Sequence, residues 1–192
     1  MTKSAAAATS MRERILETTD RLFYGQGIRA VGVDTVAAEI GISKRTLYNH
    51  FPSKDALIAA YLGRRFVQPR PSEKPPVEQI LGTFDSLERR FSAKDFRGCP
   101  FVNAVAEIGD PKHAASRIAV EFKDQRRQWF RELLLRVGVK DPDALAIQLQ
   151  ILVDGAIATA LVRNEPAVAR SARAAAEVLL DAAAGARSKR RP

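Results

Sequence analysis

Residues 33–57 read VDTVAAEIGISKRTLYNHFPSKDAL, and the apolar spacing in this stretch predicts two short helices separated by a tight turn. From Val33 to Ile40 the apolar side chains recur at positions i, i+3, i+4 and i+7, as on one face of an amphipathic helix. Gly41 then ends the helix, because glycine adopts the left-handed backbone conformation of a sharp turn without steric cost. We therefore expect the chain to change direction sharply at Gly41.

A second helix is expected to follow this turn. Ser43 can cap its first amide groups, and Pro52 favours an extended conformation in the preceding residue, so the helix ends at about Phe51. Ser53 then caps a further helix. Two short helices joined by a glycine-containing turn match the helix-turn-helix motif.

The packing between the two helices can also be predicted. Ala37 and Ala38 are small and would let the helices approach closely, whereas Ile42 and Leu47 are placed to fill the angle between them. In a helix-turn-helix, the first helix crosses the DNA backbone and the second enters the major groove. The sequence therefore predicts a DNA-reading element.

The exposed face of the second helix carries hydrogen-bond donors that suit DNA. Arg45 can pair with both acceptors of guanine, and Asn49 can pair with adenine. Lys54 lies at the start of the next helix, where free amide groups favour a phosphate. The residues expected to contact DNA are Thr35, Lys44, Arg45, Thr46, Tyr48, Asn49, His50 and Lys54.

The alternative is that this segment is a basic, solvated helix pair in another kind of helical protein. Aromatic residues at helical spacing usually belong to a core, and Phe51 fits that interpretation. Tyr48 fits it less well, because Asn49 and His50 adjoin it. We therefore favour the DNA-binding interpretation.

Residues 42–57, ISKRTLYNHFPSKDAL, resemble the signature of the tetracycline-repressor (TetR) family, and the resemblance extends back to about Ile15. Gly32 stands where the family usually has Thr or Ser, Arg45 where a small residue is common, and Asn49 where His is common. These departures leave the fold secure, but they make the operator sequence unpredictable.

The resemblance implies an all-α fold and a particular function. Residues 1–66 would form a homeodomain-like helix-turn-helix domain, and residues 77–187 a helical domain for effector binding and dimerisation. Family members are homodimers that bind pseudo-palindromic operators, mostly as repressors, and release them when a small molecule binds. The resemblance is detailed over roughly the first 65 residues and concerns only the helical layout beyond them.

Upstream of the motif, residues 10–13 read SMRE and fit a capping box, in which Ser10 bonds a free amide and Glu13 reaches back to another. This first helix is expected to end at 25–27, GQG. The apolar face expected for it consists of Ile15, Thr19, Leu22 and Phe23.

Downstream, the proline-rich residues 69–76 are expected to connect the DNA-binding head to the helical body, and residues 187–192 to form a disordered tail. Body helices are predicted near 77–93, 101–109, 112–137, 142–163 and 167–185.

The last two helices, 142–163 and 167–185, are the candidates for dimerisation, because in the family they form a four-helix bundle with the partner. The alternative is that their apolar faces belong to the core of one chain. Those faces consist of Leu145, Leu149, Leu152, Val153, Ala156, Ala160, Leu161, Val168, Ala172, Ala175, Ala176 and Leu179.

The body would also hold the effector pocket that the resemblance implies. Asp154 lies on an otherwise apolar helix, and a buried carboxylate requires a partner, which could be an effector, an arginine or solvent. Cys99 is either an inert small apolar residue or a thiol activated by Arg97. The residues expected to line the pocket are Phe84, Leu87, Phe91, Cys99, Phe101, Asn103, Gln125, Trp129 and Asp154.

Composition and charge narrow the remaining classes of function. A net charge of +9 favours a polyanionic partner, and residues 1–70 hold 11 basic against 6 acidic side chains. The chain has one Cys and two His, and we find no metal-ligand cluster, phosphate loop or nucleophile elbow, so we expect neither enzyme activity nor a cofactor. The segment before Met11 makes a poor signal peptide, and no apolar run is expected to span a bilayer. We therefore expect a cytoplasmic protein.

Overall fold

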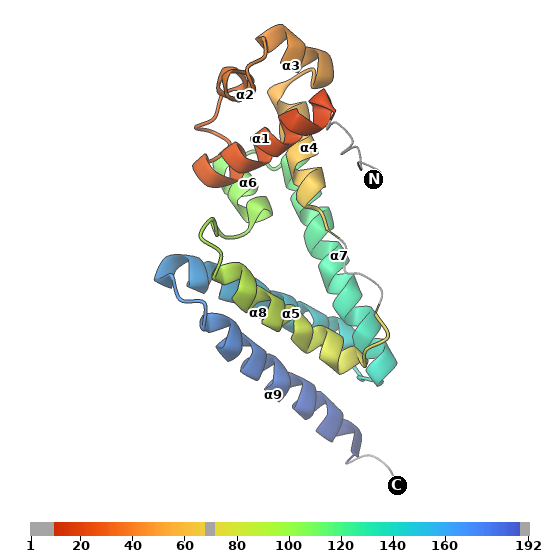
Figure 1. The fold of residues 1–192 in the computed structure, drawn as a ribbon. Helices are drawn as coiled ribbons and strands as arrows, with labels where there is room; N and C mark the ends of the chain where they lie inside the picture. The colour runs from red at the N-terminus through yellow and green to blue at the C-terminus, as the bar shows by residue number, and fades with distance from the viewer. Residues whose placement is uncertain (1–9, 68–71, 189–192) are drawn as a thin grey trace, which may run out of the picture. The chain divides into compact units, whose positions relative to one another are not determined.

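The computed structural model describes residues 10–67 and 72–188. Within these ranges the chain forms nine helices and no strand, which confirms the predicted all-α class (Figure 1). The chain divides into two compact units. The first consists of the residues up to Phe66 together with Pro100–Ala119, and the second of Val67–Cys99 and the residues from Val120 onward.

The first unit contains the predicted helix-turn-helix. Its helices are α1 (Met11–Gln26), α2 (Val33–Ile40), α3 (Lys44–His50), α4 (Lys54–Arg65), α6 (Pro100–Ile108) and the start of α7 (Ala114–Val137). The first four surround an apolar core, which favours folding by removing these side chains from water. Its fully buried members include Ile15, Leu47, Leu57, Tyr61 and Leu62.

The start of α1 differs in part from the predicted capping box. The Ser10 hydroxyl accepts a hydrogen bond from the Glu13 amide at 3.2 Å, as expected. The Glu13 carboxylate, however, pairs with Arg64 of α4 and does not reach back to Ser10. A long-range ion pair thus stands in place of the expected local hydrogen bond. All four residues of the predicted apolar face of α1 are buried.

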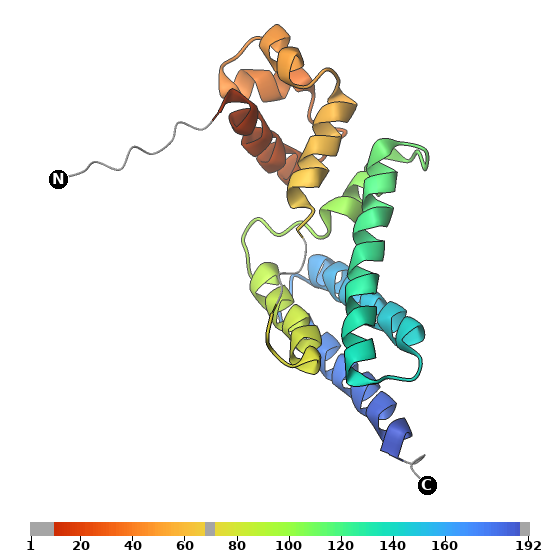
Figure 2. The same cartoon turned by 90° about the vertical axis from the view of Figure 1, so that its right-hand side faces the viewer.

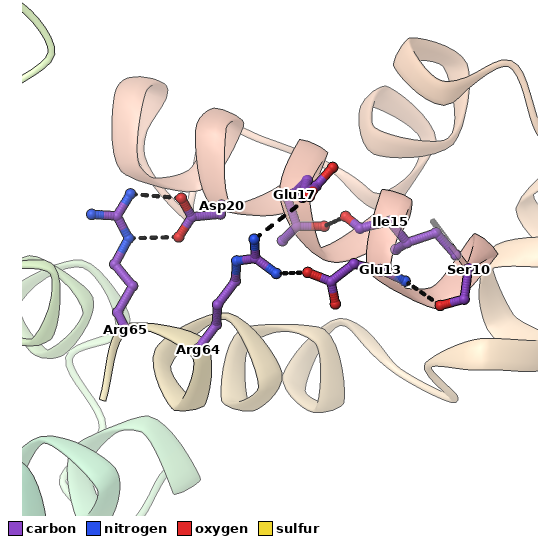
Figure 3. Close-up of polar contacts among 8 residues, drawn as sticks. Ser10, Glu13, Ile15, Glu17, Asp20, Arg64 and Arg65 are labelled. Atoms are coloured by element: carbon purple, nitrogen blue, oxygen red, sulfur yellow. Dashed lines mark hydrogen bonds and ion pairs between the residues drawn. The ribbon is translucent and has the colours of Figure 1, made fainter. Parts of the chain in front are cut away.

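Ion pairs of Arg64 with Glu13 and Glu17 and of Arg65 with Asp20 tie α1 to α4 (Figure 3). Arg64 points to Glu13, and Arg65 faces Asp20 with two hydrogen bonds, Nε to Oδ1 at 2.5 Å and Nη2 to Oδ2 at 2.7 Å. The Arg65 guanidinium also lies 4.0 Å from the centroid of the Tyr24 ring, which adds a cation–π contact. The helices that flank the helix-turn-helix are therefore fixed to each other by specific polar contacts as well as by the core.

Helix α6 contacts the loop that follows α1. Glu107 accepts a hydrogen bond from the Arg29 amide at 2.9 Å, and a Cβ atom on Gly27 would lie 2.9 Å from the same carboxylate oxygen. Phe101 meets Phe66 edge to face, with the ring centroids 6.0 Å apart. By compactness, residues 100–119 thus group with the N-terminal helices. The functional division at 1–66 and 77–187 stays a prediction.

The second unit is a helical assembly in which α5 (Pro76–Phe91), α8 (Pro142–Arg163) and α9 (Val168–Ser188) pack against one another (Figures 1 and 2). Its core also includes side chains from α7, Phe130 and Leu134. Most of the residues assigned to the dimerising face lie inside this core, because α5, α8 and α9 pack against one another. The buried ones are Leu145, Leu149, Val153, Ala156, Ala160, Ala172 and Ala176.

Several predicted helix boundaries are wrong by one or two residues. Helices α5 and α6 begin at Pro76 and Pro100, since a first-turn residue needs no amide hydrogen bond. Helix α7 begins at Ala114 rather than at 112, because the Asp110 carboxylate accepts a hydrogen bond from the Lys112 amide at 2.8 Å and holds a turn there. The predicted span 142–163 matches α8.

The C-terminal end also differs from the prediction. Arg187 and Ser188 were expected in a disordered tail but form the last residues of α9. The rest of that tail, the candidate signal segment and part of the predicted connection fall on 189–192, 1–9 and 68–71, which lie outside the described residues.

Helix α8 corrects the expectation that no segment is long and apolar enough to cross a membrane. It has 22 residues, and its most apolar window has a mean hydropathy of 1.8. About half of it is covered within its own unit, which is also typical of a core helix in a globular protein, so the finding is weak evidence for a membrane span.

Candidate nucleic-acid interface

The turn between α2 and α3 has the geometry that the sequence predicts. Gly41 adopts φ 78° and ψ 36°, in the left-handed region. Its amide donates to the carbonyl groups of Ala37 and Ala38, and the Ile42 amide donates to Ala37 at 3.0 Å. The Ser43 hydroxyl then accepts from the Thr46 amide at 3.0 Å and begins α3. Backbone and cap together fix the direction in which α3 leaves the turn.

One apolar residue anchors α3 to the unit. Leu47 is fully buried, and Phe51, immediately after the helix, is buried as well. Ala37 is buried at the contact with α3, but Ala38 is exposed, so only the first alanine allows the close approach that we predicted for both. Ile42 is half-buried. This anchoring determines which side of α3 faces solvent.

The opposite side of α3 is the donor-rich surface predicted to read DNA. Lys44, Arg45, Asn49 and His50 are exposed, and Tyr48 is 38% exposed. The structure thus brings these side chains together on one accessible helix face. A helix with this surface would be costly to bury against protein, because so many donors would each need an acceptor.

Two residues of the predicted set are engaged in local contacts. Lys44 Nζ lies 2.9 Å from Asp34 Oδ2 of α2, and this hydrogen bond together with the negative charge raises the pKa of Lys44. Thr46 is half-buried, with its hydroxyl 2.9 Å from that of Ser43. Lys44, which the sequence predicts as a DNA contact, therefore stays charged and is paired with α2.

The remaining predicted contacts lie on the two neighbouring helices. Thr35 is exposed in the first turn of α2. Lys54 opens α4 and is half-buried, with Nζ 6.0 Å from the centroid of the Phe23 ring. Because its ammonium group lies over an aromatic ring, the charge of Lys54 is held close to the core of the unit.

Arg12 is a candidate that the sequence analysis missed. It is exposed near the start of α1, and its guanidinium lies 4.9 Å from the centroid of the Phe51 ring, next to the end of α3. Its position in the first turn of α1 was the available signal, but only the fold shows that this turn adjoins α3.

The residues predicted to line an effector pocket fall into both units. Phe101 and Asn103 belong to α6 in the first unit, where Phe101 is fully buried. The other seven belong to the second unit: Phe84, Leu87, Phe91, Cys99, Gln125, Trp129 and Asp154.

Within the second unit, these residues do not form a single aromatic cluster. Phe91 packs against Phe96, with ring centroids 5.0 Å apart, and Trp129 packs against Phe130 at 5.1 Å. Cys99 is buried. Phe84 and Leu87 are buried in the core face of α5. The structure therefore places the aromatic members chiefly in the core.

Asp154 has the partner that a partly buried carboxylate requires. It forms an ion pair with Lys123 of α7 and accepts a hydrogen bond from Gln150 Nε2 at 2.9 Å. The sequence suggests an effector, an arginine or solvent as the partner, and in the structure the partners are a lysine and a glutamine. Over residues 10–67 and 72–188, no group of three or more His, Cys, Asp or Glu side chains is arranged to hold a metal ion.

Comparison with known proteins agrees with this geometry. Residues 15–61 match the family profile described as bacterial regulatory proteins, tetR family. The structure is similar to that of a tetR-type transcriptional regulator from Streptomyces avermitilis, with 36% identity, 91% of this chain and 98% of that chain covered and a TM-score of 0.79. It is also similar to that of a TetR-family regulator from Streptomyces coelicolor, with 34% identity, 90% and 95% coverage and a TM-score of 0.82.

A relative that matches by sequence is the HTH-type transcriptional regulator YjdC of Escherichia coli. It is 26% identical over 177 residues, which span 88% of this chain and 93% of that protein. These similarities extend well beyond residues 15–61 and include the helices of the second unit.

Proposed function

The chain belongs to the TetR family of transcriptional regulators, and on that premise we propose that it represses transcription by binding a pseudo-palindromic operator as a homodimer. The observation that carries this proposal is the polarity of α3. Leu47 is fully buried, while the donors from Lys44 to His50 cover the accessible side. That arrangement suits a helix placed in the major groove.

The side chains divide into two roles. Arg45 pairs with guanine and Asn49 with adenine, because each presents the paired hydrogen-bonding groups that these base edges accept. Phosphates are contacted by the other exposed or basic groups around α3, which set the register of the protein on the duplex. These are Thr35, Lys44, Thr46, Tyr48, His50, Lys54 and, as an addition, Arg12.

Dimerisation uses the apolar side chains that the second unit leaves exposed on α8 and α9. Ile151 is 62% exposed and Val162 is 86% exposed, and large apolar groups in such number favour burial against a partner. Two recognition helices can then reach half-sites about 34 Å apart or a multiple of that distance. The exposed apolar set on these helices is Ile147, Ile151, Leu161, Val162 and Val178.

A small molecule bound in the second unit releases the operator. Repression follows from occupancy, since a bound dimer blocks access to the promoter. The protein works in the cytoplasm, where bacterial DNA lies. It acts without a catalytic step of its own, in line with its similarity to transcription regulators.

Selection from a random duplex pool tests the proposal. The full-length chain is expected to enrich sequences with two inverted half-sites about 10 base pairs or a multiple apart. Fluorescence anisotropy on the enriched duplex should show affinity falling steeply with salt, because binding neutralises phosphates and releases their counterions. A pool that yields no enriched sequence, or only sites without dyad symmetry, would contradict the proposal.

A further inference from the structure

Four polar side chains meet between α7 and α8 within the second unit. Lys123 and Arg126 come from one helix and Gln150 and Asp154 from the other. Asp154 uses one carboxylate oxygen for the Lys123 ion pair and the other for the hydrogen bond from Gln150 Nε2. Both oxygens of the cluster's carboxylate are therefore already occupied.

Gln150 has an acceptor that this network does not use. The residue is only 5% exposed, and its Oε1 atom is sheltered from solvent and accepts no hydrogen bond from any described residue. Buried side-chain oxygens nearly always have a donor, and leaving one without costs the desolvation of that group. The Nε2 atom of the same side-chain amide donates to Asp154, so the unused Oε1 acceptor lies within the cluster.

Arg126 is a half-buried cation that lies farther than ion-pair distance from the nearest described carboxylate. Its guanidinium lies 4.8 Å from the centroid of the Phe122 ring, and across the described residues no carboxylate approaches it within ion-pair distance. Burial lowers the pKa of Arg126, Asp154 and Cys99 partly oppose this shift, and the positive charge of Arg90 adds to it. Asp154 offers only this longer-range attraction, because its oxygens serve Lys123 and Gln150.

The charge balance of this region is positive. Among the described residues whose charges act on Arg126 or that pair with Asp154, Arg90, Lys123 and Arg126 are cations and Asp154 is the carboxylate. Arg90 also donates to the carbonyl of Gly98 at 2.9 Å, next to Cys99, so this arginine is held in place. A neutral ligand would leave the charge of Arg126 uncompensated, and a cation would add repulsion.

We propose that the cluster binds an organic carboxylate, whose anionic group pairs with Arg126 and whose neighbouring hydroxyl group donates to Gln150 Oε1. The proposal rests on the proposed function, because it names the chemical class of the effector. A carboxylate matches the guanidinium with two parallel hydrogen bonds, and the hydroxyl supplies the donor that the amide oxygen lacks. An apolar remainder of such a ligand would pack against apolar side chains of the same unit.

Calorimetric titration of the full-length chain, without DNA, tests the class of ligand. The probes are 3-hydroxyoctanoate, octanoate and octanamide. The hydroxy acid is expected to bind most tightly, octanoate several-fold more weakly, and octanamide not measurably. Equal binding of the amide and the acid, or binding of none of the three, would overturn the proposal.

Matched variants test the residues. Arg126→Met should weaken 3-hydroxyoctanoate binding by about tenfold or more, since a charged hydrogen-bonded pair is lost. Gln150→Leu should remove the preference for the hydroxy acid over octanoate. Arg127→Met, at the neighbouring position, removes a cation that pairs with Asp143 and Asp124, and it should change affinity less than about twofold. Equal losses in Arg126→Met and Arg127→Met would count against a specific site.

Thermal unfolding without ligand gives a second readout. Arg126→Met is expected to keep or raise the melting temperature, because it removes a half-buried charge that lacks a close counterion. A clear decrease in the melting temperature would mean that Arg126 is already well paired, and it would overturn the proposal.

Operator binding, measured in parallel, separates the carboxylate-site proposal from the proposed repressor function. If the operator binds but no probe does, only the carboxylate site is wrong; if the hydroxy acid binds but no operator is found, only the proposed function is wrong.

Discussion

Arg45 and Leu47 are two residues apart on α3 and face opposite ways, one into solvent and the other into the core. Burial of Leu47 fixes the rotation of α3 about its axis, and this rotation places Arg45 on the solvent side. The amphipathic spacing made this much predictable from the sequence. The pairing of Lys44 with Asp34 was not predictable, because it depends on how closely α2 and α3 approach each other.

Replacing Arg45 and Lys54 by alanine should have different effects on operator binding. Arg45→Ala is expected to relax base preference at one position and to weaken specific binding by about 1–3 kcal/mol, as for loss of a bidentate base contact. Lys54→Ala should weaken all sequences alike and reduce the slope of log affinity against log salt by about 1. Anisotropy titrations on the selected duplex and on single-base variants would measure both, and a uniform loss for Arg45→Ala would refute its assigned role.

At the scale of the elements, caps and breaks determine the helix ends. Ser43, Ser53 and Gly41 stand where α3 and α4 begin and α2 ends, so the helix-turn-helix could be delimited from sequence. The body helices were less predictable at their ends, because Pro76 and Pro100 lie inside first turns, where proline is tolerated.

Substitutions at Gly41 should separate backbone strain from steric contact. A Cβ atom there would meet nothing within 4 Å, so any cost comes from the positive φ of 78°. We expect Gly41→Ala to destabilise the chain by about 1 kcal/mol and Gly41→Asn by less, since asparagine tolerates this conformation better. Chemical denaturation would measure the stability of the three chains, which should decrease in the order Gly, Asn, Ala at position 41. A greater loss of stability for Asn than for Ala would show that steric crowding matters instead.

The two arginines at the end of α4 offer a matched pair. Arg65 is 24% exposed, bonds Asp20 twice and lies over Tyr24, whereas Arg64 is more exposed and pairs with Glu13. We expect Arg65→Met to lower the free energy of unfolding by about 2 kcal/mol, because it leaves the partly buried Asp20 without its counterion. Arg64→Met should cost less than about 1 kcal/mol, as for most exposed ion pairs. Similar costs in urea titrations would mean that burial does not distinguish the two pairs.

For the molecule as a whole, the exposed apolar side chains of α8 lead us to expect that the protein dimerises through this helix. Ile151→Glu should shift the protein to monomers, because a charge would replace a large apolar side chain at the proposed interface. Val120→Glu is the control, since Val120 is equally exposed but lies on α7. Analytical ultracentrifugation would report the molar mass, and operator affinity should fall with it. A dimer that survives Ile151→Glu would place the interface elsewhere.

The resemblance predicted the class of the fold and the order of its helices, but the partners of many side chains could not be predicted from it. The cluster of Lys123, Arg126, Gln150 and Asp154 joins two helices whose relative rotation the sequence does not specify. The apolar faces of α8 and α9 were visible in the sequence, yet their burial inside one chain depends on α5. Local patterns thus determine elements, and long-range packing determines which of their faces remain available.

The hydrogen bond from the Arg29 amide to Glu107 has a practical consequence for the design of chimeric regulators. A graft that exchanges heads between two relatives at residue 66 would separate this carboxylate from the loop it holds, and Phe101 from Phe66. The insert would keep its recognition helix but lose these two contacts with α6. Chimeras that transfer 100–119 together with the head preserve both contacts, so such a graft needs three crossover points rather than one.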